Sequence, residues 1–404
     1  MLKKIVKSYD FTLILVIVLI SLFGLVMIYS SSMVVATTKY QVASDYFYDK
    51  QKINLLLALL VFGFFAVFPY KIFKHRYVII SIFTLSILVL ALLGLVGRNV
   101  NNAQSWIALG GLNIQPAEFI KMGMIIYLSA VYSKKQSYID DFNHAILPPI
   151  FYLLFICFLI CLQPDIGTAL IIFLIGATVI LSSGISFKSV AKLFGRLLLG
   201  LALLAPVFFL FRDKILTETR MGRLYSYLNP FDYEKNEGYQ LVNSYLAIGN
   251  GGITGQGLGQ SVMKYGYLPE PHTDFIMAVI AEELGIIGVL FVLLCLGFIV
   301  LKGYKIAARC QDPFGSLLAI GISSMIGIQT FINLGGLTGL IPITGVTLPF
   351  VSYGGSSILL LAISMGILVN VSMFITYEKR YKTGNQQTVP KEFAGLQNNR
   401  FSLK

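Results

Sequence analysis

Long apolar runs separated by short basic loops constrain this chain more than any other feature. The runs cover residues 11–29, 53–69, 77–96, 117–133, 145–162, 166–183, 190–211, 275–301, 314–334 and 353–375. Each is close to the ~20 residues that an α-helix needs to cross ~30 Å of hydrocarbon. Charged residues make up 12% of the chain, about half the share that is usual in soluble domains. The sequence therefore predicts an all-α polytopic membrane protein with about ten transmembrane helices.

The basic residues indicate the orientation, because lysine and arginine concentrate on the cytoplasmic side of membrane proteins. They lie at the N-terminus, in every second loop and after the last run, as Lys3, Lys4, Lys7, Lys71, Lys74, Arg76, Lys134, Lys135, Lys188, Lys192, Lys302, Lys305, Arg309, Lys379, Arg380 and Lys382. An even number of spans places all of them on one side, so both termini are expected in the cytoplasm. The net charge of +12 therefore does not indicate nucleic acid as a partner.

One outer loop, residues 212–274 between the seventh and eighth runs, is far longer than the others. Loops of this length without structure of their own are uncommon and usually functional. Residues 1–382 are expected to form a single ten-span membrane domain that includes this loop. The tail, residues 383–404, is polar and rich in glutamine and asparagine, so it is expected to be disordered.

Ionisable residues in or beside the apolar runs are candidates for a functional site, because they are costly inside a membrane. Glu118 and Lys121 lie three residues apart at the start of the fourth run, and Asp165 begins the sixth. Each has a simpler explanation. Pro116 and Glu118 suit a helix N-terminus with a local Glu–Lys pair, and Asp165 suits a helix cap. The alternative is that they wall a polar cavity open to the outside.

The stretch YLPEPHTDFIMAVIAEELG, residues 267–285, places acids around the start of the eighth run. Asp274 lies at the membrane boundary, where a helix cap would explain it at about 1 kcal/mol. That explanation fails for Glu282 and Glu283, because Glu282 lies about 12 Å further along the helix at ~1.5 Å per residue. A buried acid needs a cation or a water-filled cavity, and we expect Lys121 to be the partner of Glu282.

Polar residues near the end of the chain are consistent with the same cavity. Asn333 in the ninth run is explained by interhelical hydrogen bonding. The segment LPFVSYGGSS leads into the tenth run and contains Ser352, Gly354 and Gly355. The two glycines suit either a flexible cap or a backbone that closely approaches a ligand.

Basic residues of the long loop are candidates for binding an anion. Arg220 and Arg223 lie three residues apart, so on a helix they would present two guanidinium groups to one phosphate or contact lipid headgroups generically. Lys264 is a further cation. The alternative is a solvated loop, because acids in the same loop nearly balance its basic residues.

Taken in order, these segments resemble the SEDS family (shape, elongation, division and sporulation). The resemblance rests on QPAEFIK, QPDIGTA, NPF, GYQL, GQGLGQSV, YLPEPHTDFI with EELG, and LPFVSYGGSS. KYGYLPEPHTDFI and GVTLPFVSYGGSS are more similar to the FtsW division branch than to the RodA elongation branch. The chain departs from many members at Ser105, where they have an arginine.

The resemblance implies a peptidoglycan glycosyltransferase of the bacterial cytoplasmic membrane that polymerises lipid II on the outer face. It also implies a class B penicillin-binding protein, which crosslinks the product, and other division proteins as partners. The family's catalytic aspartate falls on Asp274, which would be the general base toward an acceptor sugar hydroxyl, a role worth ~10²–10⁴-fold. His272 is expected to help position it. The departing pyrophosphate needs cations, and the candidates are Arg220, Arg223, Lys264 and Lys121.

Three questions stay open at this stage. No dedicated metal site is evident in the sequence, although a divalent cation bridged by substrate phosphates would suit the chemistry. A lipid II flippase or another transporter is an alternative function, but such proteins usually have polar sites near the midplane and repeated halves. A non-catalytic scaffold for division proteins is a third function, and it would have no need of Asp274.

Overall fold

The structure is a computed structural model that describes residues 2–96, 98–100, 103–109, 112–210, 218–235 and 238–382. Within these ranges the fold is helical apart from one small sheet, which confirms the all-α polytopic class. The longer helices are α2 (Phe11–Thr38), α3 (Tyr46–Val67), α4 (Arg76–Val96), α5 (Pro116–Lys134), α6 (Leu147–Cys161), α7 (Ile166–Leu181), α8 (Phe187–Leu210), α10 (Glu218–Leu228), α11 (Tyr239–Gly251), α12 (Ile276–Arg309), α13 (Pro313–Leu337) and α14 (Gly355–Tyr377). The short ones are α1 (Leu2–Val6), η1 (Tyr70–Lys74), η2 (Gln136–Tyr138), η3 (Phe142–Ile146), η4 (Pro230–Tyr233) and η5 (Glu378–Lys382).

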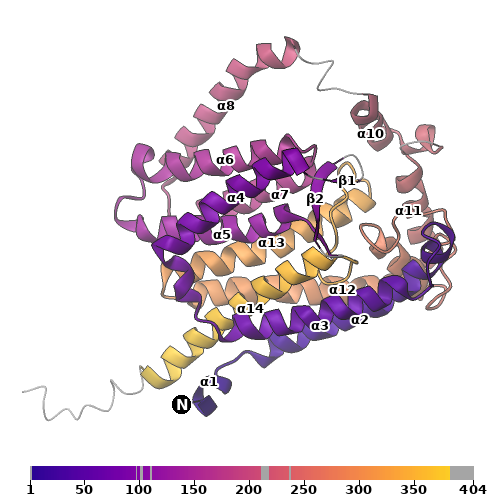
Figure 1. The fold of residues 1–404 in the computed structure, drawn as a ribbon, viewed down its shortest axis with the longest axis horizontal. Coiled ribbons are helices and arrows are strands. Elements are labelled where there is room, and N and C mark those ends of the chain that lie inside the picture. Colours follow the sequence, from indigo (N-terminus) through magenta and orange to yellow (C-terminus); the bar gives the residue numbers. More distant parts are fainter. Residues whose placement is uncertain are drawn as a thin grey trace, which may run out of the picture.

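A helix lies at each of the apolar runs of the sequence, from α2 to α8 and from α12 to α14. Among the described residues, seven helical segments are long and apolar enough to cross a membrane, and α7 is a shorter apolar helix. The loops expected outside gather with α10, α11 and the sheet toward one end of the bundle, while α1 and the end of α14 lie at the other (Figure 1). The count of ten spans and the orientation in the membrane stay predictions.

Aspartate and proline begin the helices where the sequence predicted helix starts. The side chain of Asp165 accepts a hydrogen bond from the backbone N–H of Thr168 at 3.1 Å and so caps α7. Asp312 caps α13 by accepting from the N–H of Phe314 at 3.3 Å, and Pro313 occupies the first turn. These caps satisfy N–H groups that have no partner inside the helix.

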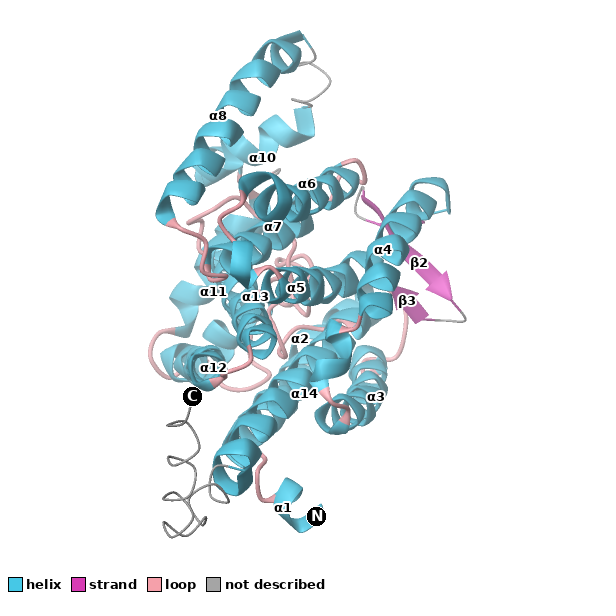
Figure 2. Cartoon of the chain, turned by 90° about the vertical axis from the view of Figure 1, so that its left-hand side faces the viewer, coloured by secondary structure: helices cyan, strands magenta, loops and turns pink. Residues whose placement is uncertain are grey.

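Two hydrophobic cores hold the bundle together. The larger core joins α2, α3, α12, α13 and α14 with inner residues of α5 and α7, and the smaller core joins α4, α5, α6 and α7. Helix α3 packs along α14, and α12 packs along α13 and α11. Helix α8 projects away from the other spans in both views (Figures 1 and 2).

Two outer segments that the sequence left as loops have structure of their own. A three-stranded antiparallel sheet precedes α5, with β2 (Ala103–Leu109) between β1 (Arg98–Val100) and β3 (Leu112–Ile114). The long loop 212–274 contains α10, η4 and α11. The tail 383–404 lies outside the described residues, so its expected disorder stays a prediction.

Helix α12 is broken once, at Gly285, whose φ is 62°. The break leaves the carbonyls of Glu282 and Glu283 without helical partners. They accept hydrogen bonds from the backbone N–H groups of Gln256 and Gly257, both at 2.9 Å. The segment before α12 therefore folds back on the helix and pairs with it at the break.

Candidate active site

Asp274 lies two residues before α12, at the end of the bundle where α10, α11 and the sheet gather (Figure 1). It does not cap this helix, whose capping position is Phe275. Its backbone carbonyl accepts a hydrogen bond from the Asn333 side chain at 2.8 Å, and its carboxylate accepts one from the Thr273 hydroxyl at 2.9 Å. Asp274 therefore does not act as a helix cap, so capping does not explain why an acid stands here.

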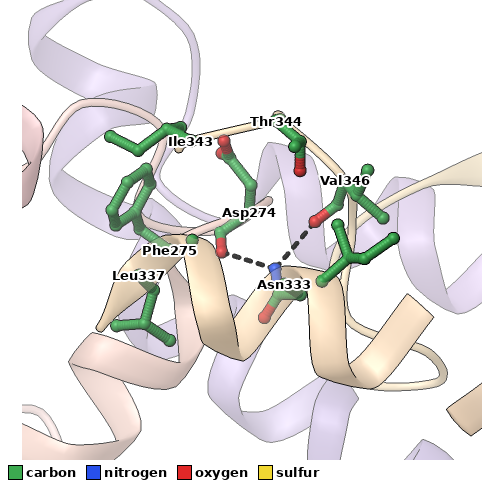
Figure 3. A pocket seen from close by; sticks show the side chains of 10 residues that line it. Asp274, Phe275, Asn333, Leu337, Ile343, Thr344 and Val346 are labelled. Atoms are coloured by element: carbon green, nitrogen blue, oxygen red, sulfur yellow. Dashed lines mark hydrogen bonds between the residues drawn. The ribbon is translucent and has the colours of Figure 1, made fainter. Parts of the chain in front are cut away.

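A small pocket borders this carboxylate. Figure 3 shows the Asp274 side chain beside Ile343 and Thr344, pointing away from Asn333. The lining residues come from the two positions before α12, the end of α13 and the segment 343–346, and the space that water can occupy is about 10 Å³. Gly345 has a φ of 69°, and a Cβ on it would lie 3.9 Å from Asp274 Oδ2. The backbone thus approaches the carboxylate closely on this side.

The surroundings of Asp274 favour its protonated form. Loss of water around the carboxyl group raises its pKa to about 6, and the hydrogen bond from Thr273 acts weakly in the other direction. The negative charge of Glu270 raises the pKa further. A carboxylate with a pKa near neutrality is suited to accept and release protons at physiological pH.

His272 is packed rather than free. Its side chain is buried, with its ring centroid 4.4 Å from that of Phe47 and 5.6 Å from that of Tyr353. Burial lowers its pKa to about 4, so the ring is neutral at pH 7 and cannot supply a positive charge there. Its Nδ1 atom has no hydrogen-bond partner among the described residues.

The segment before α14 holds the Asp274 segment in place. The Ser352 hydroxyl donates to the carbonyl of Thr273 at 2.5 Å, and the backbone N–H of Tyr353 donates to the carbonyl of His272 at 2.9 Å. Asn333 also donates to the carbonyl of Val346 at 2.7 Å, as expected for a residue that joins elements. Ser352 and Asn333 therefore fix the main chain on both sides of Asp274.

The two glycines of that segment contact α3 and not Asp274. The N–H of Gly354 donates to the Gln51 side chain at 3.4 Å. A Cβ on Gly355 would lie 3.2 Å from the Asn54 side chain. This close approach of backbone to α3 accounts for Gly355 without a ligand.

Glu118 and Lys121 form a second group, which we name the Glu118 cluster together with Gln115 and Asp165. The Lys121 ammonium lies 2.7 Å from Glu118 Oε1, and both side chains are buried. The Gln115 side chain donates to Asp165 at 3.1 Å. Its backbone N–H donates to the hydroxyl of Ser356 at 3.0 Å, so the first turn of α14 also reaches this cluster. Glu118 Oε2 is buried without a partner among the described residues.

The expected ion pair between Lys121 and Glu282 is wrong. Lys121 pairs with Glu118, three residues away on its own helix. Glu282 is instead satisfied by the chain that folds back at the break of α12. It accepts hydrogen bonds from the Ser261 hydroxyl and from the backbone N–H groups of Val262 and Met263, the last two at 3.1 and 3.3 Å.

Lys264 is a candidate ligand of the pyrophosphate in the sequence, but its position does not favour that role. Its side chain is fully buried. Its ammonium lies 2.9 Å from Glu283, 2.7 Å from the carbonyl of Gly259 and 3.3 Å from the Ser30 hydroxyl. Ser30 in turn donates to Glu283 at 2.7 Å. We name Ser30, Lys264, Glu282 and Glu283, with Ser261, the Lys264 cluster. Its cation is occupied and cannot turn outward to a phosphate.

The two arginines of the long loop lie on a described helix. Arg220 and Arg223 lie on α10, which confirms that a helix presents them, but their side chains lie outside the described part of the chain. Among the described residues, no three His, Cys, Asp or Glu side chains gather in a way that could hold a metal ion. Arg220 and Arg223 therefore stay predicted ligands of an anion.

One ion pair beside Asp274 was not anticipated from the sequence. Lys39, at the end of α2, lies 2.8 Å from Glu270, four residues before Asp274. The sequence shows Lys39 in the loop that follows the first apolar run. The residues around Lys39 in the sequence do not indicate which acid pairs with it, because Glu270 lies 231 positions away.

The family model and the related sequences that match this chain indicate the same family. The family model FTSW_RODA_SPOVE, described as "Cell cycle protein", matches residues 10–377. The chain is 56% identical to the "Probable peptidoglycan glycosyltransferase FtsW" of Bacillus subtilis over 95% of each chain. It is 38% identical to the "Stage V sporulation protein E" of the same species, covering 92% of this chain and 98% of that protein.

Solved structures share the fold. A chain from a peptidoglycan synthase complex described as coordinating polymerization and crosslinking matches with a TM-score of 0.72 and 26% identity, over 93% of this chain and 99% of that one. The rod shape determining protein RodA of Thermus thermophilus matches with a TM-score of 0.63 and 25% identity, over 92% of this chain and 98% of that one. Both matches run through nearly the full length of each chain.

Proposed function

The chain belongs to the FTSW_RODA_SPOVE family of cell cycle proteins, and from this membership we propose that it is a peptidoglycan glycosyltransferase. The relative at 56% identity carries this activity in its name. The substrate is lipid II, a disaccharide-pentapeptide on undecaprenyl pyrophosphate, and the product is a glycan strand. The enzyme acts at the outer face of the bacterial cytoplasmic membrane, with both termini in the cytoplasm.

Each transfer joins two sugars and releases a lipid pyrophosphate. A hydroxyl group of the acceptor sugar attacks the anomeric carbon that carries the pyrophosphate. A glycosidic C–O bond forms, and the bond between the carbon and the pyrophosphate oxygen breaks with its electron pair going to the oxygen. The hydroxyl proton passes to the carboxylate of Asp274, which acts as the general base.

The state of the Asp274 carboxylate is the observation that supports this role best. Its main chain is held by Asn333, and through Thr273 by Ser352. The carboxylate receives a hydrogen bond from the Thr273 hydroxyl and one from its own backbone N–H, and it borders the pocket with capacity to accept another. A pKa of about 6 leaves it ionised at pH 7 and still able to take up a proton.

Other residues of the site would act on the substrate or on Asp274. His272 is buried beside Asp274 and neutral, which supports a positioning role. The Glu118 cluster is proposed to line the path of the sugar, because Glu118 Oε2 is buried and still unpaired. Arg220 and Arg223 remain proposed pyrophosphate ligands. Lys264 and Glu282 would act only through the structure they hold.

A class B penicillin-binding protein is the proposed partner, because it would crosslink the strands that this chain makes. The structural match to a chain of a complex that coordinates polymerization and crosslinking supports this assignment. The match to an FtsW of Bacillus subtilis supports a place among division proteins.

The variant Asp274→Asn tests the function. It keeps the size of the side chain but removes its basicity, so we expect at least a hundredfold slower glycan synthesis from labelled lipid II, in line with the ~10²–10⁴-fold effect of a general base. Asp45→Asn is the matched control, because Asp45 lies at the start of α3 and makes no side-chain cap hydrogen bond.

The same assay separates the alternative functions. Glycan strands from the wild-type chain and none from Asp274→Asn support the proposal. Movement of lipid II across liposomes without strands would indicate a transporter, and neither product would indicate a scaffold. Strands made by Asp274→Asn at the wild-type rate would reject the general-base role.

A further inference from the structure

Lys39 differs from Lys121 and Lys264 in how much solvent its side chain contacts. The side chains of Lys121 and Lys264 are buried, and each is committed to an acid inside the fold. The side chain of Lys39 is 56% exposed, and that of its partner Glu270 is 24% exposed. Pairs exposed to this extent are weak and screened by salt, so a ligand with more than one negative charge would displace the carboxylate.

The backbone on both sides of this pair is strained. Gln41, two residues after Lys39, has a φ of 52°, and Glu270 has a φ of 53°. Non-glycine residues rarely adopt this left-handed conformation, and it concentrates at ligand-binding and switch segments. The strain therefore marks both chain segments that meet at the ion pair.

Aromatic rings connect Lys39 with the Asp274 segment. The Lys39 ammonium lies 5.5 Å from the ring centroid of Tyr40. Tyr40 lies 5.3 Å from Phe47, and Phe47 lies 4.4 Å from His272, again between ring centroids. Nδ1 of the buried His272 has no partner among the described residues. Phe47 and His272 are buried, whereas Tyr40 is exposed. Lys39 therefore offers a ligand a cation beside one accessible ring that is packed toward the Asp274 segment, a combination that suits a sugar bearing a phosphate.

We propose that Lys39 binds the pyrophosphate of the lipid-linked sugar, and that Glu270 is its counter-ion in the empty site. The proposal rests on the proposed function, because that function supplies the ligand. When the substrate arrives, the pyrophosphate takes the place of the Glu270 carboxylate on the Lys39 ammonium. Glu270 competes with the pyrophosphate for the Lys39 ammonium, so it weakens binding until it has been displaced.

The test compares opposite single changes. Radiolabelled undecaprenyl pyrophosphate is bound to the full chain in phosphatidylcholine nanodiscs. Lys39→Met should bind it roughly five- to tenfold more weakly, because one charge-assisted contact is lost. Glu270→Gln should bind it at least as tightly as wild type. If the pair were merely structural, both variants would lose the same ion pair and change binding in the same direction, which would overturn the proposal.

Three controls sharpen the result. Lys52→Met removes a lysine of matched exposure, 54%, that pairs with Asp49, and it should leave binding unchanged. Undecaprenol lacks phosphate, so its binding should not respond to Lys39→Met. The gain from Glu270→Gln should vanish in the Lys39→Met background, because Glu270 acts through Lys39. A gain that persists there would assign the effect to general repulsion and reject the counter-ion role.

Binding and synthesis distinguish this inference from the proposed function. If wild type makes no glycan strands but binds the pyrophosphate through Lys39, the proposed function fails and the binding site stands. If wild type makes strands and Lys39→Met binds undecaprenyl pyrophosphate normally, the proposed function stands and Lys39 is not the ligand.

Discussion

At the scale of single residues, Asp274 is an acid that the fold positions through its main chain. Asn333 and Ser352 hold the backbone around it. The described residues place no lysine or arginine within ion-pair distance of its carboxylate, since none of the ion pairs includes it. Its raised pKa follows from loss of water that no neighbouring cation offsets.

This raised pKa predicts opposite trends for activity and stability. Activity should fall as the pH drops through about 6, because protonation removes the base. The free energy of unfolding should instead be larger at low pH than at high pH, as far as Asp274 contributes to it. The folded state favours the neutral acid, so this contribution is complete below the unfolded pKa of 3.8 and is lost as the pH rises through about 6.

The variant Asp274→Asn stays neutral at every pH and should remove that loss. Its melting temperature should exceed that of wild type at pH 7.5, and the difference should shrink toward zero near pH 4. Thermal unfolding in detergent across this pH range provides the measurement. An equal melting temperature for the two proteins at both pH values would show that the carboxylate is not held away from water.

At the scale of elements, the break in α12 at Gly285 lets another segment of backbone pair with the helix. Gly285 frees carbonyls that bind the returning segment 252–257, and a Cβ there would lie 2.4 Å from the carbonyl oxygen of Ile253. The helix could be predicted from its apolar run. Its break could not, because a single glycine in an apolar helix is tolerated in most contexts.

Substitution of Gly285 tests the break. Gly285→Ala should cost about 2–4 kcal/mol, because it combines a left-handed φ with contact against backbone. Gly297→Ala is the control in the same helix, since a Cβ there meets nothing within 4 Å, and it should leave stability nearly unchanged. Thermal unfolding midpoints that agree for the two variants would contradict the close packing at Gly285.

The other elements missed from the sequence share one property, which is short length. The strands β1 and β3 have three residues each, too few for a recognisable alternation. Helix α11 has 13 residues and buries Leu241, Val242 and Ala247, but it is too short to be read as a span. In contrast, the caps at Asp165 and Asp312 lie where an acid precedes an apolar run, so they follow from local sequence alone.

At the scale of the whole molecule, the Lys264 cluster joins segments from opposite parts of the chain. Ser30 on α2 lies 253 positions from Glu283 on α12, and Lys264 bonds to both. The sequence identified these acids as residues that need partners but assigned the wrong lysine. The chain has many lysines, and the segment that folds back at the Gly285 break is what brings Lys264 to these acids.

The cluster predicts a large effect on stability. Glu283→Gln leaves the Lys264 ammonium buried without its counter-charge and should cost roughly 3 kcal/mol. Asp49→Asn breaks the exposed Lys52–Asp49 pair and should cost less than about 1 kcal/mol. Denaturation of the purified proteins in the same detergent gives both values. A loss for Glu283→Gln no larger than that of the control would mean that water or another group satisfies Lys264.

The main-chain anchoring of Asp274 has a consequence for the cell. Because the hydrogen bonds that the described residues give the carboxylate are local, from Thr273 and from its own backbone, its proposed chemistry should be separable from the architecture of this chain. A copy that lacks the base would still present the same surfaces to any assembly that takes it in. It would occupy places meant for working copies, so the harm of an inactive allele would grow with its abundance even beside a normal one.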